Sequence, residues 1–135
     1  MALLTWDSSY SVSVKSCDFE HQKLFSLVNQ LNEAMKVGKG RAILADIVRE
    51  LEKYTQTHFY AEEALMLRSN YPDLAPHRLQ HQEFVKKVSG FRKELESGDS
   101  GDSLEVLSFL QGWLANHILK TDKMYSSHLN SNGIN

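Results

Sequence analysis

The sequence predicts an all-α protein, an up-down-up-down antiparallel four-helix bundle preceded by an irregular N-terminal arm. The 135 residues include only two prolines and seven glycines, which favours long unbroken helices. Apolar residues recur at helical spacing in four stretches, and short turn sequences separate them. Apart from the brief SYSVSV of residues 9–14, no stretch alternates with period two. A single domain covering 1–135, with its helices joined by short loops, is the economical packing.

The arm spans about residues 1–17, and the first helix is expected over 18–37. That helix would end near Gly38 and Gly40, with Lys36 in its last turn, where a cation favours the helix dipole. The second helix is expected over 41–68 and stops at the turn sequence SNYPD. Its apolar positions are Leu44, Ile47, Val48, Leu51, Tyr54, Leu65 and Met66, and those of the first helix are Leu24, Phe25, Val28, Leu31 and Met35.

The third helix is expected over 76–97, because Pro76 suits a first helical position. The sequence SGDSGDS at 97–103 then breaks the helix and supplies capping side chains for a fourth, expected over 103–128. The tail NSNGIN is expected to fray. The apolar faces carry Phe84, Val88, Phe91 and Leu95 in the third helix, and Leu107, Leu110, Trp113, Leu114, Ile118 and Tyr125 in the fourth.

Composition argues against several classes of partner. The formal net charge is −2, and no basic stripe indicates nucleic-acid binding or a charged membrane surface. No apolar run is long enough for membrane insertion, and the first residues lack the pattern of a signal peptide. Cys17 is the only cysteine, so no intramolecular disulfide can form, and we expect a cytoplasmic monomer. A nucleophilic role for Cys17 is the less favoured interpretation.

Histidines lie on the faces that periodicity predicts to be buried. His77 and His81 are four residues apart, which places both on one helix face. The apolar face of the first helix continues back to His21, and that of the fourth helix continues to His117. The second continues to His58 and, one turn later, Glu62. A buried imidazole or carboxylate is costly unless it is hydrogen-bonded, paired or bound to an ion.

In an antiparallel bundle these positions also share one level. They lie early in the first and third helices and late in the second and fourth, where Asp122 joins them. Seven nitrogen and oxygen donors are too many for one ion and suit two ions that share bridging carboxylates. Imidazole with carboxylate favours iron, copper or zinc, and two irons bridged by Glu62 and Asp122 fit best.

Other candidate groups are assigned elsewhere. We expect His128 to be solvated in the polar C-terminal stretch, and Glu63 to be exposed because it lies off the apolar face. Met66 and Met124 are expected to pack, because soft thioethers do not match the hard ligands around them.

The spacing of His117 and Asp122 is awkward. Five residues on a regular α-helix separate two side chains by about 140°. Either Asp122 reaches around from the flank of the helix, or the helix contains a π-bulge at this point. We favour the flank, because a carboxylate that bridges two ions can approach from the side.

These residues together resemble the hemerythrin family, in particular its single-domain bacterial members. His21 and the segments HFYAE (58–62), HRLQH (77–81) and HILKTD (117–122) match every ligand position of the hemerythrin signature. The similarity also includes Trp6 and covers nearly the whole chain. It implies a non-haem di-iron centre, oxo- or hydroxo-bridged, that binds O2 reversibly. By this resemblance His77, His81 and His117 hold one iron, His21 and His58 hold the other, and Glu62 and Asp122 bridge them.

The resemblance implies an oxygen carrier, store or supplier rather than an enzyme. Oxygen-activating di-iron bundles use four glutamates and two histidines, whereas this chain offers five imidazoles and two carboxylates. A di-iron enzyme, or a protein that handles iron, nitric oxide or peroxide, is the alternative. An oxygen-consuming enzyme is a conceivable partner. Phe25, Trp113 and Leu114 lie on inward faces near the ligands, so they are candidates for the wall of the O2 pocket. For Trp113 and Leu114 we favour the pocket, and for Phe25 we favour plain core packing.

Overall fold

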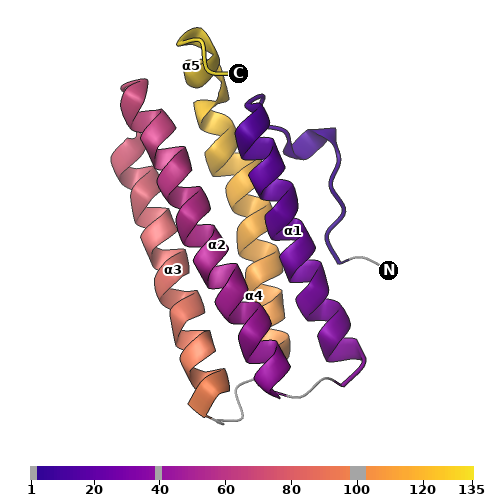
Figure 1. Ribbon diagram of the computed structural model, residues 1–135. Coiled ribbons are helices and arrows are strands. Elements are labelled where there is room, and N and C mark those ends of the chain that lie inside the picture. Colours follow the sequence, from indigo (N-terminus) through magenta and orange to yellow (C-terminus); the bar gives the residue numbers. More distant parts are fainter. Residues whose placement is uncertain (1–2, 39–40, 98–102) are drawn as a thin grey trace.

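The computed structural model describes residues 3–38, 41–97 and 103–135, and its architecture is the predicted four-helix bundle. The helices are α1 (Lys15–Lys36), α2 (Arg41–Arg68), α3 (Leu74–Ser97) and α4 (Ser103–Asn116). Figure 1 shows the four packed side by side with alternating direction. The all-α prediction is confirmed, and no strand occurs in the described ranges. Gly40, expected near the end of the first helix, and residues 98–102, expected to break the third helix and cap the fourth, lie outside the described residues.

Two helices begin earlier than their sequence patterns suggested. α1 starts at Lys15 rather than 18, and there the Asp18 backbone donates to the Val14 carbonyl at 2.9 Å. α3 starts at Leu74 rather than Pro76. A proline is tolerated in the first helical turn, where its missing N–H would have no partner within the helix. Pro76 therefore lies within the first turn of α3 and does not mark its start.

The fourth helix is not a regular helix to its end. After α4 the chain continues through η2, a π-helical segment (His117–Thr121), then η3, a 3-10 segment (Asp122–Tyr125), and α5 (Ser126–Ser131). All three lie at the end of the bundle where α1 and α3 begin and α2 ends (Figure 1). This end carries the predicted ligands.

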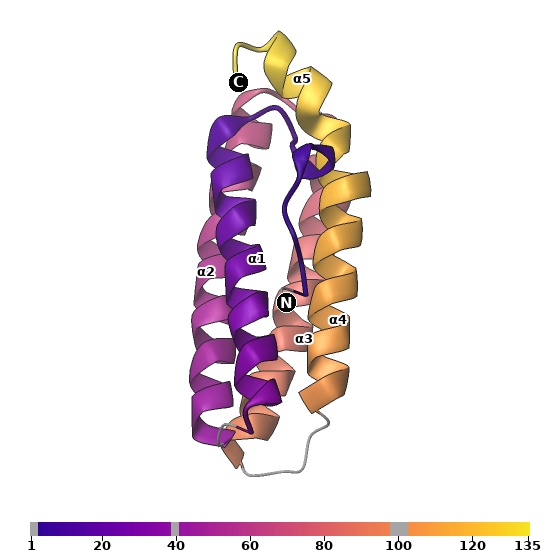
Figure 2. The ribbon, with the colours of Figure 1, turned by 90° about the vertical axis from the view of Figure 1, so that its right-hand side faces the viewer.

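The N-terminal arm lies beside α1 and crosses toward α4 (Figure 2). It contains one short 3-10 segment, η1 (Ser8–Tyr10), capped by the Asp7 carboxylate. The Leu4 backbone exchanges two hydrogen bonds of 2.8 Å with the Asn29 side chain. At its other end, Asp18 accepts hydrogen bonds from the arm. The arm is thus fastened to α1 at two points.

The C-terminal tail is ordered, so the prediction of fraying was wrong. The Ile134 N–H donates to the Leu129 carbonyl at 3.0 Å, and Gly133 adopts a φ of 78°, which a glycine accepts without strain. The Asn130 side chain donates to the carbonyls of Ser13 and Ile134. These bonds close the tail onto α5 and the arm.

The core is continuous along the bundle and is formed by the inward faces that periodicity predicted. Met66 is fully buried, as expected for a packing residue. Met124 is 62% exposed, so the prediction that it packs was wrong, because Asp122 and Tyr125 are the residues of η3 that turn inward. Within the described residues, the structure contains no helix long and apolar enough to cross a membrane.

Candidate metal centre

Seven buried histidine and carboxylate side chains meet at one level of the bundle. α1 supplies one, α2 two, α3 two, η2 one and η3 one. All have at most 5% of their surface exposed, and they are His21, His58, Glu62, His77, His81, His117 and Asp122. The structure thus brings together every residue that the sequence analysis proposed as a metal ligand.

Glu62 lies between two groups of histidines and turns one oxygen toward each. Its Oε1 lies 3.2 Å from His77 Nε2 and 3.1 Å from His81 Nε2. Its Oε2 lies 3.3 Å from His21 Nε2 and 3.4 Å from His58 Nε2. This division of the two oxygens is the arrangement that a bridging carboxylate needs.

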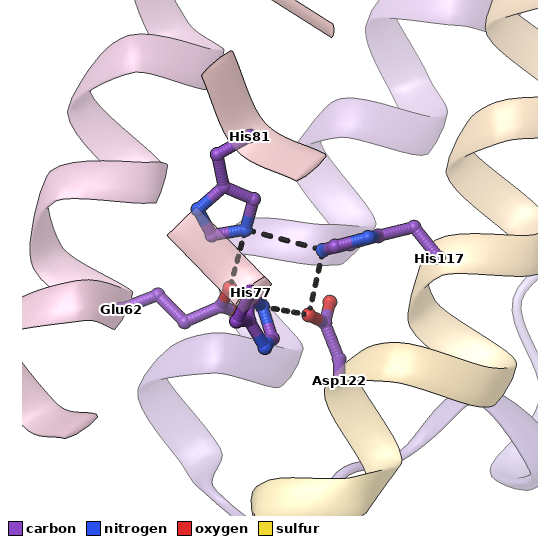
Figure 3. Close-up of side chains that lie close together, drawn as sticks. All are labelled: Glu62, His77, His81, His117 and Asp122. Carbon is purple, nitrogen blue, oxygen red and sulfur yellow. Dashed lines mark hydrogen bonds and ion pairs between the residues drawn. The ribbon is translucent and has the colours of Figure 1, made fainter. Parts of the chain in front are cut away.

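Asp122 divides its oxygens in the same way. Its Oδ1 lies 2.9 Å from the Nε2 atoms of both His77 and His117, whereas its Oδ2 lies 3.1 Å from His21 Nε2. Figure 3 shows the three-histidine group with both carboxylates turned toward its centre. The two carboxylates therefore separate a three-histidine group from a two-histidine group.

The spacing of the donor atoms fits bound cations. With bonds of about 2.1 Å, adjacent ligand atoms around an octahedral ion lie about 3.0 Å apart. His81 Nε2 and His117 Nε2 are 3.1 Å apart, and one ligand atom from each of five residues lies within 4.8 Å of the others. His21, His58 and Glu62 form a second such group.

Several of these buried atoms have no hydrogen-bond partner. Neither ring nitrogen of His21 and neither carboxylate oxygen of Asp122 makes a hydrogen bond. A buried polar atom left unsatisfied costs about 1–3 kcal/mol, more when it is charged. A cation held between them would satisfy His21 Nε2 and both Asp122 oxygens, so the residues present fit a dinuclear metal centre.

Asp122 reaches the centre because of the π-helical segment. Its backbone N–H donates to the His117 carbonyl, five residues earlier. The wider turn brings His117 and Asp122 onto the same side of the chain, although a regular α-helix would separate them by about 140°. The preference for a side chain reaching from the flank was therefore wrong.

Three polar side chains hold the outer nitrogens of the histidines, and the sequence analysis proposed none of them as site residues. His58 Nδ1 lies 2.8 Å from Glu20, His81 Nδ1 2.8 Å from Glu63, and His117 Nδ1 2.9 Å from Gln80 Oε1. A protonated Nδ1 that donates to such a partner leaves Nε2 free to bind a metal. None of the three lies on an apolar face, so periodicity could not identify them.

The expectation that Glu63 is exposed was wrong. Its side chain is only 19% exposed, and it accepts a hydrogen bond of 2.8 Å from Arg78 in addition to its contact with His81. It is thus a half-buried partner of a predicted ligand and not a solvated neighbour of Glu62.

The expectation that His128 is solvated was also wrong. It is half-buried, its Nε2 donates to the Ser69 carbonyl at 2.7 Å, and its ring lies 5.4 Å from that of Tyr71. It joins α5 to the end of α2. The residue is structural and is not solvated.

Aromatic rings cover the predicted ligands. Trp113 stacks on His117 with centroids 4.3 Å apart, and Phe59 stacks on His81 at 3.8 Å. Phe25 is buried and packs edge-on against Trp6, whose ring lies 6.5 Å from that of His21. Of the candidate pocket residues, Trp113 therefore borders the three-histidine group, and Phe25 lies behind the two-histidine group. Leu114 is buried with 3% exposed.

Tyr125 contacts the centre through its hydroxyl group. The hydroxyl donates to Glu62 Oε2 at 2.8 Å, and the ring stacks on His77 with centroids 5.7 Å apart. Burial, together with the charges of Glu62 and Asp122, raises the pKa of Tyr125 well above its usual range. The hydroxyl is therefore a donor to the carboxylate at neutral pH.

The carboxylates favour the protonated forms of His58 and His77. Burial opposes the charged imidazolium of His58, but Glu62 and Glu20 outweigh burial and raise its pKa to about 10. Asp122 and Glu62 likewise raise the pKa of His77 to about 9 against the effect of burial. A metal must displace these protons, so its uptake releases protons to solvent.

Cys17 is buried close to the centre. Burial, reinforced by the charge of Glu62, raises the pKa of its thiol above the usual range. A protonated, buried thiol is a poor nucleophile. The burial of Cys17 therefore agrees with the sequence analysis, which did not favour a nucleophilic role for this residue.

Comparison with known proteins decides the family. The model of the protein family described as "Hemerythrin HHE cation binding domain" matches residues 12–129 of this chain. The chain belongs to the hemerythrin family. A hemerythrin binds O2 at a non-haem di-iron centre, and the buried histidine and carboxylate side chains described above are able to hold that cofactor.

Alignments with individual relatives extend over almost the whole length of this hemerythrin. A bacteriohemerythrin of Stenotrophomonas maltophilia is 33% identical, with 96% of this chain and 86% of that protein covered. A myohemerythrin of Riftia pachyptila is also 33% identical over 92% of each chain. The crystal structure of a wild-type hemerythrin is 30% identical and superimposes with a TM-score of 0.89, covering 95% of this chain and 98% of that one.

Proposed function

We propose that this hemerythrin binds O2 reversibly at the iron held by His21 and His58, and that it carries, stores or delivers O2 without acting as an enzyme. In this assignment His77, His81 and His117 hold the other iron, and Glu62 and Asp122 bridge the pair. The bound irons supply the electrons that O2 binding requires. The protein side chains supply the asymmetry between the two sites.

The observation that carries the proposal is an unequal number of protein donors. The three-histidine group offers five atoms: three Nε2 nitrogens, Glu62 Oε1 and Asp122 Oδ1. The two-histidine group offers four: two Nε2 nitrogens, Glu62 Oε2 and Asp122 Oδ2. With one solvent-derived bridge, five protein donors complete an octahedron and four do not. The two-histidine group would therefore be the one that leaves room for O2 on a bound iron.

The donor set also favours a carrier. Five imidazoles are neutral when they bind a metal, and only two carboxylates offset the charge of the cations. Bundles that activate oxygen typically surround their irons with four glutamates, whose charge stabilises higher oxidation states. Of the proposed pocket residues, Trp113 covers the three-histidine group, whereas Phe25 and Leu114 would keep the O2 side apolar. An apolar wall denies water the polar partners it needs to lodge there.

The assignment is tested by His58→Ala. This substitution removes one of two histidines at the O2-binding iron, so we expect oxygenation to be lost while the helical fold remains. The measurement is the absorption spectrum through cycles of air and argon, together with iron content and circular dichroism. His128→Ala is the matched control, because His128 is a half-buried histidine that contacts Ser69 and no predicted ligand.

Two results would contradict the proposal. A full oxygenated spectrum in the His58→Ala protein would show that this histidine is not at the O2-binding iron. Steady turnover of peroxide or nitric oxide by the unmodified protein, with no reversible oxygenated form, would make it a di-iron enzyme instead.

A further inference from the structure

The hydroxyl group of Tyr125 distinguishes one carboxylate of the centre from the other. It donates to Glu62 Oε2 at 2.8 Å, and both side chains are fully buried. Asp122 faces only histidine ring nitrogens, at 2.9 to 3.1 Å, and in the described part of the chain no hydroxyl group donates to either of its oxygens. The two bridging carboxylates are therefore chemically unequal, because only Glu62 shares its negative charge with a hydroxyl proton.

The bond is also directed to one half of the centre. Glu62 Oε2 is the oxygen that faces His21 and His58, at 3.3 and 3.4 Å, whereas Oε1 faces the three-histidine group. Tyr125 therefore acts on the oxygen that would bind the two-histidine iron. That iron is the one proposed to bind O2.

Two aromatic contacts restrict the position of the Tyr125 ring and so of its hydroxyl. One face lies on the His77 ring, with an interplanar angle of 26°, and Tyr71 meets the ring edge-on at 6.5 Å. Tyr125 ends η3, immediately after the π-helical segment that places Asp122. The same irregular backbone thus positions a bridging carboxylate and the donor to the other one.

We propose that Tyr125 is a positioning residue that fixes the orientation of Glu62 and weakens the donation of Oε2 to the O2-binding iron. This inference rests on the ligand assignment proposed above. A hydrogen bond to a carboxylate stabilises its negative charge in place, so less of that charge reaches a bound cation. Because ferric iron gains more from a strong anionic ligand than ferrous iron does, the bond favours the reduced state that can bind O2.

The test is Tyr125→Phe, which removes only the hydroxyl oxygen. We expect two irons per chain, a lower reduction potential and about tenfold faster decay to the diferric form in air. Tenfold corresponds to the loss of one hydrogen bond of about 1.4 kcal/mol. Tyr71→Phe is the matched control: that tyrosine is also buried and touches the Tyr125 ring, but it makes no hydrogen bond to the predicted ligands. It should leave potential and decay rate unchanged.

A second variant keeps the ring and strengthens the bond instead. Replacement of Tyr125 by 3,5-difluorotyrosine makes the hydroxyl a stronger donor, so we expect the opposite shift, a higher potential and slower decay. An unchanged potential in both variants would overturn the proposal. Slower decay in Tyr125→Phe would also overturn it, because the hydroxyl would then serve as a proton source for oxidation.

Glu62→Ala separates failure of this inference from failure of the ligand assignment. If Glu62 bridges the irons, its removal lowers iron content below two per chain. Unchanged iron content in Glu62→Ala would refute the bridge and the proposed function with it. Loss of iron in Glu62→Ala, combined with an unaltered potential in Tyr125→Phe, would refute the role of Tyr125 alone.

Discussion

The two halves of the metal centre differ in how firmly their histidines are held. In the three-histidine half, His81 contacts Glu63, His117 contacts Gln80, and His77 is stacked on Tyr125. In the two-histidine half, His58 contacts Glu20, but His21 makes no hydrogen bond through either ring nitrogen. The two-histidine half thus has both fewer donor atoms and fewer contacts that hold its histidine rings than the three-histidine half.

In the proposed function this difference would separate retention of metal from reaction with O2. A fully surrounded ion is held by many ligands but has no position for a further one, whereas an incomplete ligand set can bind a small molecule. The bundle provides both within one layer, because Glu62 and Asp122 each turn one oxygen toward each half. The following changes act on the link between the halves, on their outer support and on the apolar wall.

The largest effect is expected from moving Asp122, the proposed bridging aspartate, by one residue. Thr121→Asp combined with Asp122→Thr places the carboxylate where a regular α-helix would need it, but the π-helical turn directs position 121 elsewhere. We expect the protein to retain at most one iron per chain, measured by metal analysis after gel filtration. Thr121→Ala is the control for the hydrogen bond from Thr121 to Gln80. Normal iron content in the double variant would show that the bridge does not depend on this backbone.

A smaller effect is expected from removing the outer carboxylates. Loss of an outer partner of a metal-binding histidine typically weakens metal affinity about 10–100-fold. We expect Glu20→Ala to speed chelator extraction of one iron, that of the two-histidine half, and Glu63→Ala to affect the other half. The measurement is the time course of iron release. Arg78→Ala, which leaves Glu63 in place, should change little, and identical release from both glutamate variants would contradict independent support of the halves.

The smallest effect is expected at the apolar wall. Leu114→Asn introduces a side chain that can hold water near the ligands, so the protein should fold and bind two irons but lose its oxygenated form several-fold faster in air. The measurement is the decay of the oxygenated absorption band. Leu110→Asn, one helical turn farther from His117, serves as the control at a similarly buried leucine. Equal decay of Leu114→Asn and the unmodified protein would assign Leu114 to the core alone.

The fold class and the family could be predicted from the sequence. Helical periodicity identified the inward faces, and the antiparallel order placed His21, His58, His77 and His117 at one level. Periodicity did not predict which side chains meet where the helix departs from regular α-helical geometry. The five-residue spacing between His117 and Asp122 allowed two explanations, and the less favoured one, the π-helical segment, is present.

Residues off the apolar faces were the least predictable. Glu63 and His128 are half-buried and hydrogen-bonded, although both had been expected to be exposed. The tail was expected to fray from its polar composition, but it closes through backbone and Asn130 hydrogen bonds. The partners of Glu63 and His128 lie on other elements, so no local pattern contains them. The tail instead closes on nearby residues, because Gly133 with its φ of 78° lets the Ile134 N–H return to the Leu129 carbonyl.

The sequence by itself determined which residue types lie inward and at which level, because burial follows a period of 3.6 and antiparallel helices reverse their order. That information identified the ligand types and favoured two metal ions, and the resemblance of the ligand motifs to the hemerythrin signature implied the family. Only the tertiary structure decided which oxygen of each carboxylate faces which histidines, which side chains hold the outer nitrogens, and that Tyr125 donates to Glu62. These features depend on distances of about 3 Å between residues of different helices, which the spacing of residues along a single chain does not specify.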